Sequence, residues 1–351
     1  MVSRNAQLQL ILLAAVLAGF NARTSQAGEF QWLHTNAIAQ VVVVENPKAI
    51  AQYEADASIA QEMVDRGLIH LTGKASANAA WLSLVSTNDV VGIKVYSLAG
   101  SISGTRPAVV AAIAHGLMQA GIPPQHVIIW DKREDDLEDA GFFVLARKLG
   151  VRIAGSFESG YDETIFYNPD TAVIGNLVWG DLEFGRKGAG IGRKSFVSSL
   201  VTKQITKIIS VAPLLNNYDA GVCGHLYSVA LGSVDNTRRF ENDPDRLAVA
   251  IPEIYALPVL GDRVALNVTD ALIAQYEGGS RGLLQYSAVL NQLWFSRDPV
   301  ALDTLALKAL DRCRQAASAP EYTPDLEIYT NATLLQLGIN DPSKIHTEKV
   351  K

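Results

Sequence analysis

The alternation of apolar β-branched runs with helix-periodic segments is the feature that most constrains this fold. Runs such as DVVGIKVYS (89–97) and HVIIWD (126–131) are typical of buried strands. Segments such as TRPAVVAAIAHGLMQAG (105–121) have the apolar spacing and the closing glycine of helices. The same order recurs along the chain. We therefore expect an α/β fold, with a mainly parallel sheet and helices on both faces.

The region between about residues 160 and 200 breaks this pattern. It is rich in Gly, Asn, Asp and aromatic residues, which favour turns, so we expect a loop- and hairpin-rich insertion. Within it, GRKGAGIGRKS (185–195) does not match a phosphate-binding loop, because Arg193 stands where that loop requires glycine. A basic hairpin is the better interpretation.

The first 27 residues have the organisation of an export signal. Arg4 precedes an apolar stretch (8–20), and Ser25 and Ala27 form the small-residue pair that signal peptidase recognises. The apolar stretch is short for a bilayer span. We therefore expect cleavage before Gly28 and an exported, periplasmic or extracellular protein whose mature chain has no stable membrane span. An uncleaved membrane anchor is the alternative.

Charge and cysteine content exclude several partners and cofactors. The chain has 30 basic and 36 acidic residues, and loss of Arg4 and Arg23 leaves 28 basic residues and a formal charge of −8. An acidic chain without a basic arm disfavours nucleic acid as a partner. Two cysteines, Cys223 and Cys313, are too few for an iron–sulfur cluster or a structural zinc site. We interpret them as separate thiols, with one disulfide as the alternative.

One helix start has the features of an anion site. Thr105 is expected to cap the helix that begins with Arg106, and Lys94 ends the strand before it. Helix N-termini attract anions, and ligands of open α/β sheets bind outside the carboxyl ends of the strands. The alternative is that acids such as Asp131 or Asp298 pair with these cations, so that no ligand is needed.

The stretch GVCGHLYSVALGSVDNTRRF (221–240) concentrates reactive side chains. On a helix starting near Ala220, Cys223 and Tyr227 share a face, while His225 is rotated away. That geometry is poor for a nucleophile and its base, and it supplies too few ligands for a metal ion.

Two further loops complete the expected site. In DNTRRF (235–240), Asn236 favours a turn, and Arg238 or Arg239 suits bidentate binding of a carboxylate or phosphate. Pairing of these arginines with nearby acids is the alternative. Asp298 stands at a strand-to-helix junction, where it either caps the helix or faces the same cleft.

Eight segments, in this order, resemble the bacterial family called domain of unknown function 362. They are DVVGIKVYS, TRPAVVAAIAHGLMQAGI, HVIIWD, ITKIISVAPLL, AGVCGHLYSVALGSVDNTRRF, IPEIYALPVLGDRVALNVTDALIAQYEGG, FSRDPVALDTLAL and LLQLGINDPSKI. The resemblance begins near residue 85 and implies an α/β domain of this family (85–345). Residues 28–84 match less clearly, and we expect them to form an N-terminal segment packing on the main domain, after the signal peptide (1–27). Many members are exported, and the family's biochemical role is not established.

The chain departs from the family pattern in the stretch where the resemblance implies a ligand site. Family members usually have Lys-x-His where this chain has Leu215, Asn216 and Asn217, and they tend to have Lys-Asn at Tyr227 and Ser228. Cationic or titratable positions are thus neutral here. The resemblance then implies a changed specificity or a lost activity.

Three functions follow from these observations. The first is an exported enzyme of undefined class acting on a small anionic or polar ligand. The second is a non-catalytic ligand-binding or accessory protein that has lost the family's Lys and His. A purely structural interaction protein is the third and least favoured. The candidate ligand-binding residues are Lys94, Thr105, Arg106, Asn216, Asn217, Asn236, Arg238, Arg239 and Asp298, and the sequence identifies no catalytic residue, cofactor or metal ligand.

Overall fold

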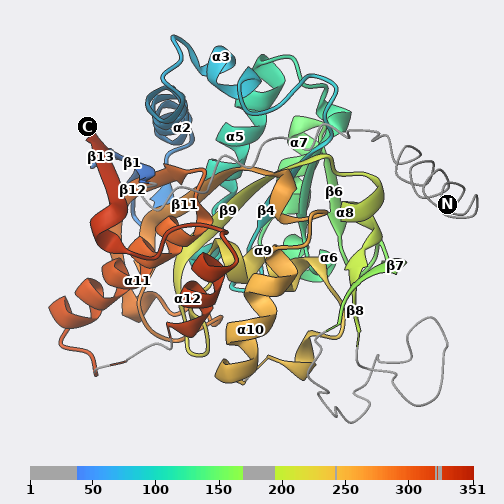
Figure 1. Cartoon of the computed structure of the whole chain (residues 1–351). Coiled ribbons are helices and arrows are strands. Elements are labelled where there is room, and N and C mark those ends of the chain that lie inside the picture. Colours follow the sequence, from blue (N-terminus) through green and yellow to red (C-terminus); the bar gives the residue numbers. More distant parts are fainter. Residues whose placement is uncertain (1–37, 169–193, 242, 321, 323–325) are drawn as a thin grey trace, which may run out of the picture. The chain divides into compact units, whose positions relative to one another are not determined.

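One mixed sheet runs through the computed structural model, which describes residues 38–168, 194–241, 243–320, 322 and 326–351. Its strand order is β13-β1-β12-β11-β9-β4-β5-β6, and the short β10 pairs with β9 (Figure 1). The strands of this sheet are β1 (Ala39–Glu45), β4 (Val91–Val95), β5 (Val127–Asp131), β6 (Arg152–Gly155), β9 (Lys207–Asn217), β10 (Gly221–Val222), β11 (Val264–Gln275), β12 (Ser287–Ser296) and β13 (Ile345–Val350). Strands β4, β5, β6, β9 and β11 are parallel, whereas β12 is antiparallel to its neighbours β11 and β1.

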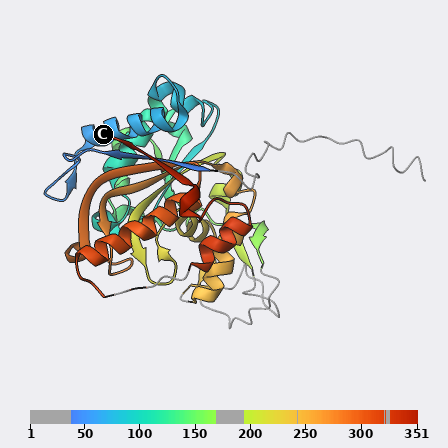
Figure 2. The same ribbon diagram turned by 60° about the vertical axis from the view of Figure 1, so that its left-hand side comes forward.

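Helices cover both faces of this sheet. The first face carries α2 (Ala57–Thr72), α3 (Ala77–Leu82), α5 (Pro107–Gln119), α6 (Glu134–Asp139) and α7 (Phe142–Leu149). The second face carries α8 (Ser199–Lys203), α9 (His225–Ser233), α10 (Pro244–Tyr255), α11 (Pro299–Ala316) and α12 (Glu327–Leu334). In Figure 2 the blue helix α2 and the orange-red helix α11 lie on opposite sides of the strands.

Successive strand residues enter opposite cores, as the pleat of a strand requires. On β12, Phe295 packs with the helices of the first face and Trp294 with those of the second. On β9, Ile209 likewise packs on the first face and Ile208 on the second. Strands buried on both faces are nearly continuous in hydrophobicity, which is the pattern that the sequence shows. The predicted α/β fold, with a mainly parallel sheet and helices on both faces, is confirmed.

The order of the strands reverses between β4 and β9. From β4 the chain adds β5 and β6 on one side, and it later places β9 and β11 on the other side. The loops that follow β4 and β9 therefore leave the sheet in different directions. In open α/β sheets such a switch point is where ligands bind, outside the carboxyl ends of the strands.

The N-terminal segment is part of the main sheet. β1 pairs with β12 on one side and with β13 on the other, so it is an internal strand. Residues 38–351 form one compact unit. The described part of the segment 28–84 thus contributes β1 to the main sheet, and its helices α2 and α3 pack on the first face of that sheet.

The predicted insertion contains a hairpin, in which β7 (Tyr161–Tyr167) pairs antiparallel with β8 (Ser195–Ser198). The signal peptide predicted at 1–27 and most of the basic segment 185–195 lie outside the described residues. Two short strands, β2 (Ile50–Ala51) and β3 (Glu54–Ala55), form a separate ribbon, and α4 (Gly100–Ser103) follows β4. In the part of the chain that the structure describes, no helix has the length and apolar character of a membrane span.

Candidate functional site

A buried lysine–aspartate pair lies at the switch point. Lys94 stands near the end of β4 and Asp131 ends the neighbouring β5, with Lys94 Nζ 2.7 Å from Asp131 Oδ1. Nζ also donates to Ser228 Oγ on α9 (2.9 Å) and to the Val95 carbonyl oxygen (2.6 Å). Burial lowers the pKa of Lys94, and the charge of Asp131 opposes that shift. Because the ammonium group has three N–H donors and all three are used, Lys94 has none left for a ligand.

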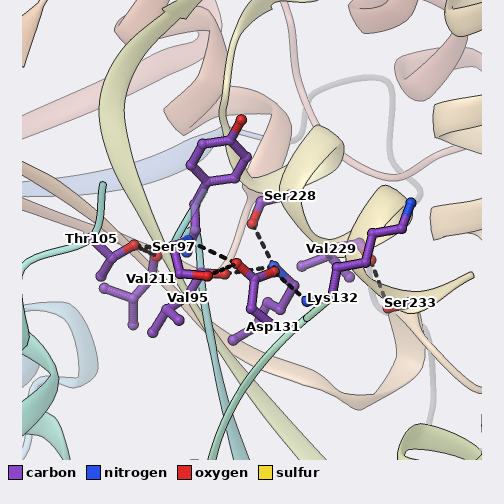
Figure 3. A network of polar contacts seen from close by, with 11 residues as sticks. Val95, Ser97, Thr105, Asp131, Lys132, Val211, Ser228, Val229 and Ser233 are labelled. Atoms are coloured by element: carbon purple, nitrogen blue, oxygen red, sulfur yellow. Dashed lines mark hydrogen bonds and ion pairs between the residues drawn. The ribbon is translucent and has the colours of Figure 1, made fainter. Parts of the chain in front are cut away.

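The carboxylate of Asp131 is equally occupied (Figure 3). Its Oδ2 accepts from the backbone N–H and from the hydroxyl of Ser97, both at 2.7 Å, and Oδ1 also accepts from Lys132 N (2.8 Å). On α9, Gly232 lies directly over Lys94, and a Cβ atom there would overlap the lysine side chain. The pair therefore fixes two loops and α9 against the sheet.

Arg106 is paired within the protein as well. Its Nη1 donates to Asp270 Oδ1 (3.0 Å), and its backbone N–H donates to Asp270 Oδ2 (2.9 Å). Both side chains are buried. Asp270 belongs to β11, so this pair connects the start of α5, which follows β4, with the β9–β11 side of the switch point. Both Arg106 and Lys94 are thus paired with acidic side chains of the protein itself, Asp270 and Asp131. This agrees with the alternative stated above, in which internal acids neutralise these cations and no ligand is needed.

Thr105 does not cap α5, because Arg106 holds the N-cap position of that helix. Instead, Thr105 Oγ1 accepts from Tyr96 N (2.9 Å) and donates to the Val211 carbonyl oxygen (2.7 Å). Val211 is on β9, so this hydroxyl bridges the two strands where the order of the sheet reverses (Figure 3). The prediction that the Thr105 hydroxyl caps α5 is therefore wrong. The hydroxyl does bond to the backbone, but at Tyr96 and Val211 instead of at the first turn of that helix.

Tyr96 and Cys223 belong to a small buried cluster beside these pairs, and the half-buried Tyr227 packs against it. The rings of Tyr96 and Tyr227 have centroids 6.4 Å apart, and Asn217 Nδ2 lies 3.7 Å from Cys223 Sγ. Burial raises the pKa of Cys223 to about 11. The thiol is therefore protonated near neutral pH, which makes it a poor nucleophile.

His225 points away from this cluster, as the helical spacing predicted. It is fully buried, with Nδ1 2.8 Å from Ser210 Oγ and Nε2 3.0 Å from Thr269 Oγ1. Burial lowers its pKa to about 3, so the ring is neutral. The helix α9 starts at His225 instead of Ala220, because Asp303 on α11 accepts the His225 N–H (2.7 Å) there.

Asn216 and Arg314, two buried side chains on the β9–β11 side of the carboxyl edge, keep donors without a hydrogen-bond partner in the described part of the chain. Asn216 is fully buried; its Oδ1 accepts from Gly279 N (3.1 Å), but its Nδ2 is unpartnered. Arg314, in the last turn of α11, is buried, and its Nε and Nη2 form no hydrogen bond. The guanidinium lies 4.7 Å from the centre of the Tyr322 ring, and Nε lies 3.6 Å from Glu277 Oε2.

These orphan donors distinguish Asn216 and Arg314 from the other candidates. Both border the loop that follows β11, through Gly279 and Glu277 respectively. Buried polar groups in proteins almost always have hydrogen-bond partners, so these unpartnered donors are unusual. Sequence reasoning included Asn216 but missed Arg314, because an arginine in the last turn of a helix has an ordinary role at the helix dipole.

The segment with Asn236, Arg238 and Arg239 forms hydrogen bonds to the start of β8 and to the residue before it. Asn236 Nδ2 donates to the Lys194 carbonyl oxygen (3.0 Å), and Arg239 is buried with its Nη2 on Ser195 Oγ. Arg238 is exposed. The segment thus anchors the β7–β8 hairpin, and none of these hydrogen bonds connects it to the carboxyl end of β9.

Asp298 requires a correction. β12 is antiparallel to β11, so its last residue, Ser296, pairs with Asn267 near the beginning of β11. Asp298 therefore lies at the edge of the sheet opposite to Arg106 and Asn217. There it caps α11 by accepting from Ala301 N (2.8 Å), and burial raises its pKa to about 6. The sequence identified the cap, but it gave no indication that this strand runs antiparallel.

Both cysteines are free thiols: Cys223 is buried and Cys313 is half-buried. Among the described residues, no group of three His, Cys, Asp or Glu side chains is arranged to hold a metal ion.

Comparisons with known proteins add little about function. No family model and no curated protein matches the chain. The crystal structure of a structural-genomics target protein from Thermotoga maritima is similar with a TM-score of 0.40 and 12% identity, over 77% of this chain. The chain spans 61% of the length of that protein. The resemblance to domain of unknown function 362 stays a prediction.

Removal of one member of the central pair tests its structural role. Lys94→Met leaves the Asp131 carboxylate buried without its cation, so we expect the free energy of unfolding to fall by about 3–5 kcal/mol. The matched control is Lys203→Met, because the Lys203 side chain is 63% exposed and lies 3.9 Å from Asp162; a change below about 1 kcal/mol is expected there. Equal effects in urea denaturation would contradict this role for Lys94.

The pH dependence of stability tests the buried carboxyl group of Asp303. Burial raises its pKa to about 7, from 3.8 for the exposed group. Between these values the folded state keeps a proton that the unfolded state releases, so the stability from Asp303 is full below about pH 4 and is lost as the pH rises to about 7, by at most about 1.4 kcal/mol per pH unit.

Urea unfolding of the wild type and of Asp303→Asn at several pH values from 4.5 to 7.5 measures this effect. The stability of the wild type relative to the variant should decrease as the pH rises. His225 acts in the opposite direction over this range, because its pKa is lowered, but it is present in both proteins and cancels in the difference. A difference that does not change with pH would show that Asp303 has an ordinary pKa.

Proposed function

We propose that this protein binds a small anionic or polar molecule at the carboxyl edge of its sheet, next to the loop that follows β11. The single observation that carries the proposal is the presence there of buried donors without a hydrogen-bond partner among the described residues, namely Asn216 Nδ2 and the Nε and Nη2 atoms of Arg314. A guanidinium binds carboxylates and phosphates through parallel hydrogen bonds, and a side-chain amide donates to a further oxygen of such a ligand.

The surroundings of Arg314 support this role. The Tyr322 ring against the guanidinium and the Tyr218 ring, 6.2 Å from that of Tyr322, restrict how the arginine can move. Glu277 reduces the local positive charge without taking a hydrogen bond from Nε. A preordered guanidinium with free N–H groups loses less entropy when it binds a ligand.

Binding without catalysis is the better-supported form of this function. The side chains with the greatest chemical reactivity near the switch point are Lys94, Cys223 and His225. Lys94 has used all its donors, Cys223 is held as a protonated thiol, and both ring nitrogens of His225 have partners. None is left with the free, activated group that a nucleophile or a general base needs.

A ligand screen by thermal denaturation tests the proposal. Phosphate, sulfate, succinate and citrate are the probes, since a molecule that binds only the folded state raises the melting temperature. Each charge-assisted hydrogen bond contributes roughly 1.5–3 kcal/mol. Arg314→Gln should therefore weaken the affinity for the bound probe about tenfold or more, and Arg238→Gln, at an exposed position, should leave it unchanged.

Circular dichroism of Arg314→Gln provides the control for folding. No melting-temperature shift with any of the four anions, or equal affinities of the wild type and a folded Arg314→Gln protein, would exclude the proposed site.

We also propose that the protein is exported and belongs to the domain of unknown function 362 family. The organisation of residues 1–27 supports export, and the eight segments in order support the family. N-terminal sequencing of the protein recovered from an expressing bacterium should return a chain that starts at Gly28. A chain that retains residues 1–27 would favour the membrane-anchored alternative.

A further inference from the structure

A pocket of about 810 Å³ lies between α11 and strands β1, β12 and β13. It is separate from the carboxyl-edge site, since neither Asn216 nor Arg314 lines it. Its volume is in the range of sites for small organic molecules. Nothing in the proposed function uses this pocket.

The floor of the pocket is one stripe across three strands. Val43 of β1 pairs in register with Trp294 of β12 on one side and with Lys349 of β13 on the other, and all three line the pocket. Leu290 and Tyr276 extend the apolar part of the lining. Ser287, Gln292 and Thr347 also line the pocket, so the floor combines apolar and polar side chains, with a cation where the stripe reaches the last strand of the sheet.

The wall of the pocket is one side of α11. Leu305, Ala309, Arg312, Cys313 and Ala316 line it, and their spacing of three, four, seven or eight residues places them along one face of the helix. The two alanines leave space above the strands that larger side chains would fill. Arg314, between these positions, faces Glu277 at the end of β11 instead.

The charges around the pocket have one sign. The described residues that line it include two basic side chains, Arg312 and Lys349, and no acidic one, in a chain with more acidic than basic residues. Both basic residues are exposed, and neither forms an ion pair with a described residue at 4.0 Å or less. Apolar side chains such as Val43, Leu290 and Trp294, with cations at the border of the pocket, are complementary to a molecule with an apolar body and an anionic head group.

We infer that this pocket is a second binding site, for a small amphipathic anion such as a medium-chain alkyl carboxylate. The alkyl chain lies over Val43 and Trp294, where it is removed from water. The carboxylate lies between Arg312 and Lys349, which keeps the charge at the exposed border of the pocket. This site does not depend on the site at Asn216 and Arg314.

Equilibrium dialysis with radiolabelled decanoate tests the inference on the full chain. Decanoate should bind, and decan-1-ol and decyltrimethylammonium, with the same chain and a neutral or cationic head group, should compete at least tenfold less well. The double variant Arg312→Gln/Lys349→Gln should weaken decanoate binding about tenfold. Arg147→Gln/Lys148→Gln, at two exposed positions of α7, is the control that removes the same number of charges and should have no effect.

Alkylation with iodoacetamide locates the bound molecule. Cys313 lines the pocket and is half-buried, whereas Cys223 is fully buried, so peptide mass spectrometry distinguishes the two thiols. Decanoate should slow the alkylation of Cys313 several-fold. Ala309→Phe, which fills the pocket next to the floor, should abolish decanoate binding, while Arg314→Gln should leave it unchanged.

Absence of decanoate binding to the wild type would overturn the inference. So would binding that survives in both the double variant and Ala309→Phe, or equal competition by the three head groups. Because Arg314→Gln affects only the carboxyl-edge site, failure of the proposed function and failure of this inference are distinguishable.

Discussion

The ion pair between Lys94 and Asp131 is the interaction on which the switch point depends. Removal of two charges from water is costly, and their attraction offsets that cost only when the remaining polar groups are satisfied. Here the ammonium has three acceptors, and the carboxylate accepts four hydrogen bonds, two of them from Ser97. The positions of α9 and of the loops after β4 and β5 follow from this requirement.

A second buried pair, Arg106 with Asp270, acts across the same junction. Together the pairs explain why cations gather at this edge of an acidic protein without a ligand to neutralise them. Asn216 and Arg314, on the β9–β11 side of the switch point, are among the buried residues with donors that have no hydrogen-bond partner in the described part of the chain.

The sequence was informative for several local features. The spacing of Cys223, His225 and Tyr227 predicted which side chains separate, and the Asp298-Pro299 step predicted the start of α11. It failed where a partner is distant in the chain. Asp270 is 164 residues from Arg106, so no pattern around Arg106 shows that its charge is already neutralised. The antiparallel direction of β12 is set by its pairing with β11 and β1. Asp298, which follows β12, therefore lies at the edge of the sheet opposite to the carboxyl ends of the parallel strands.

The pairing of β1 with β13 has a consequence for the order of folding. Ala39, at the start of β1, faces Ile345, which is 306 residues away in the sequence, and Val44 faces the equally distant Val350. Until β13 has been synthesised, this edge of β1 offers free N–H and C=O groups to other chains. Closure of this side of the sheet therefore joins residues that are very distant in the sequence, which favours slow folding and a need for protection of the nascent chain.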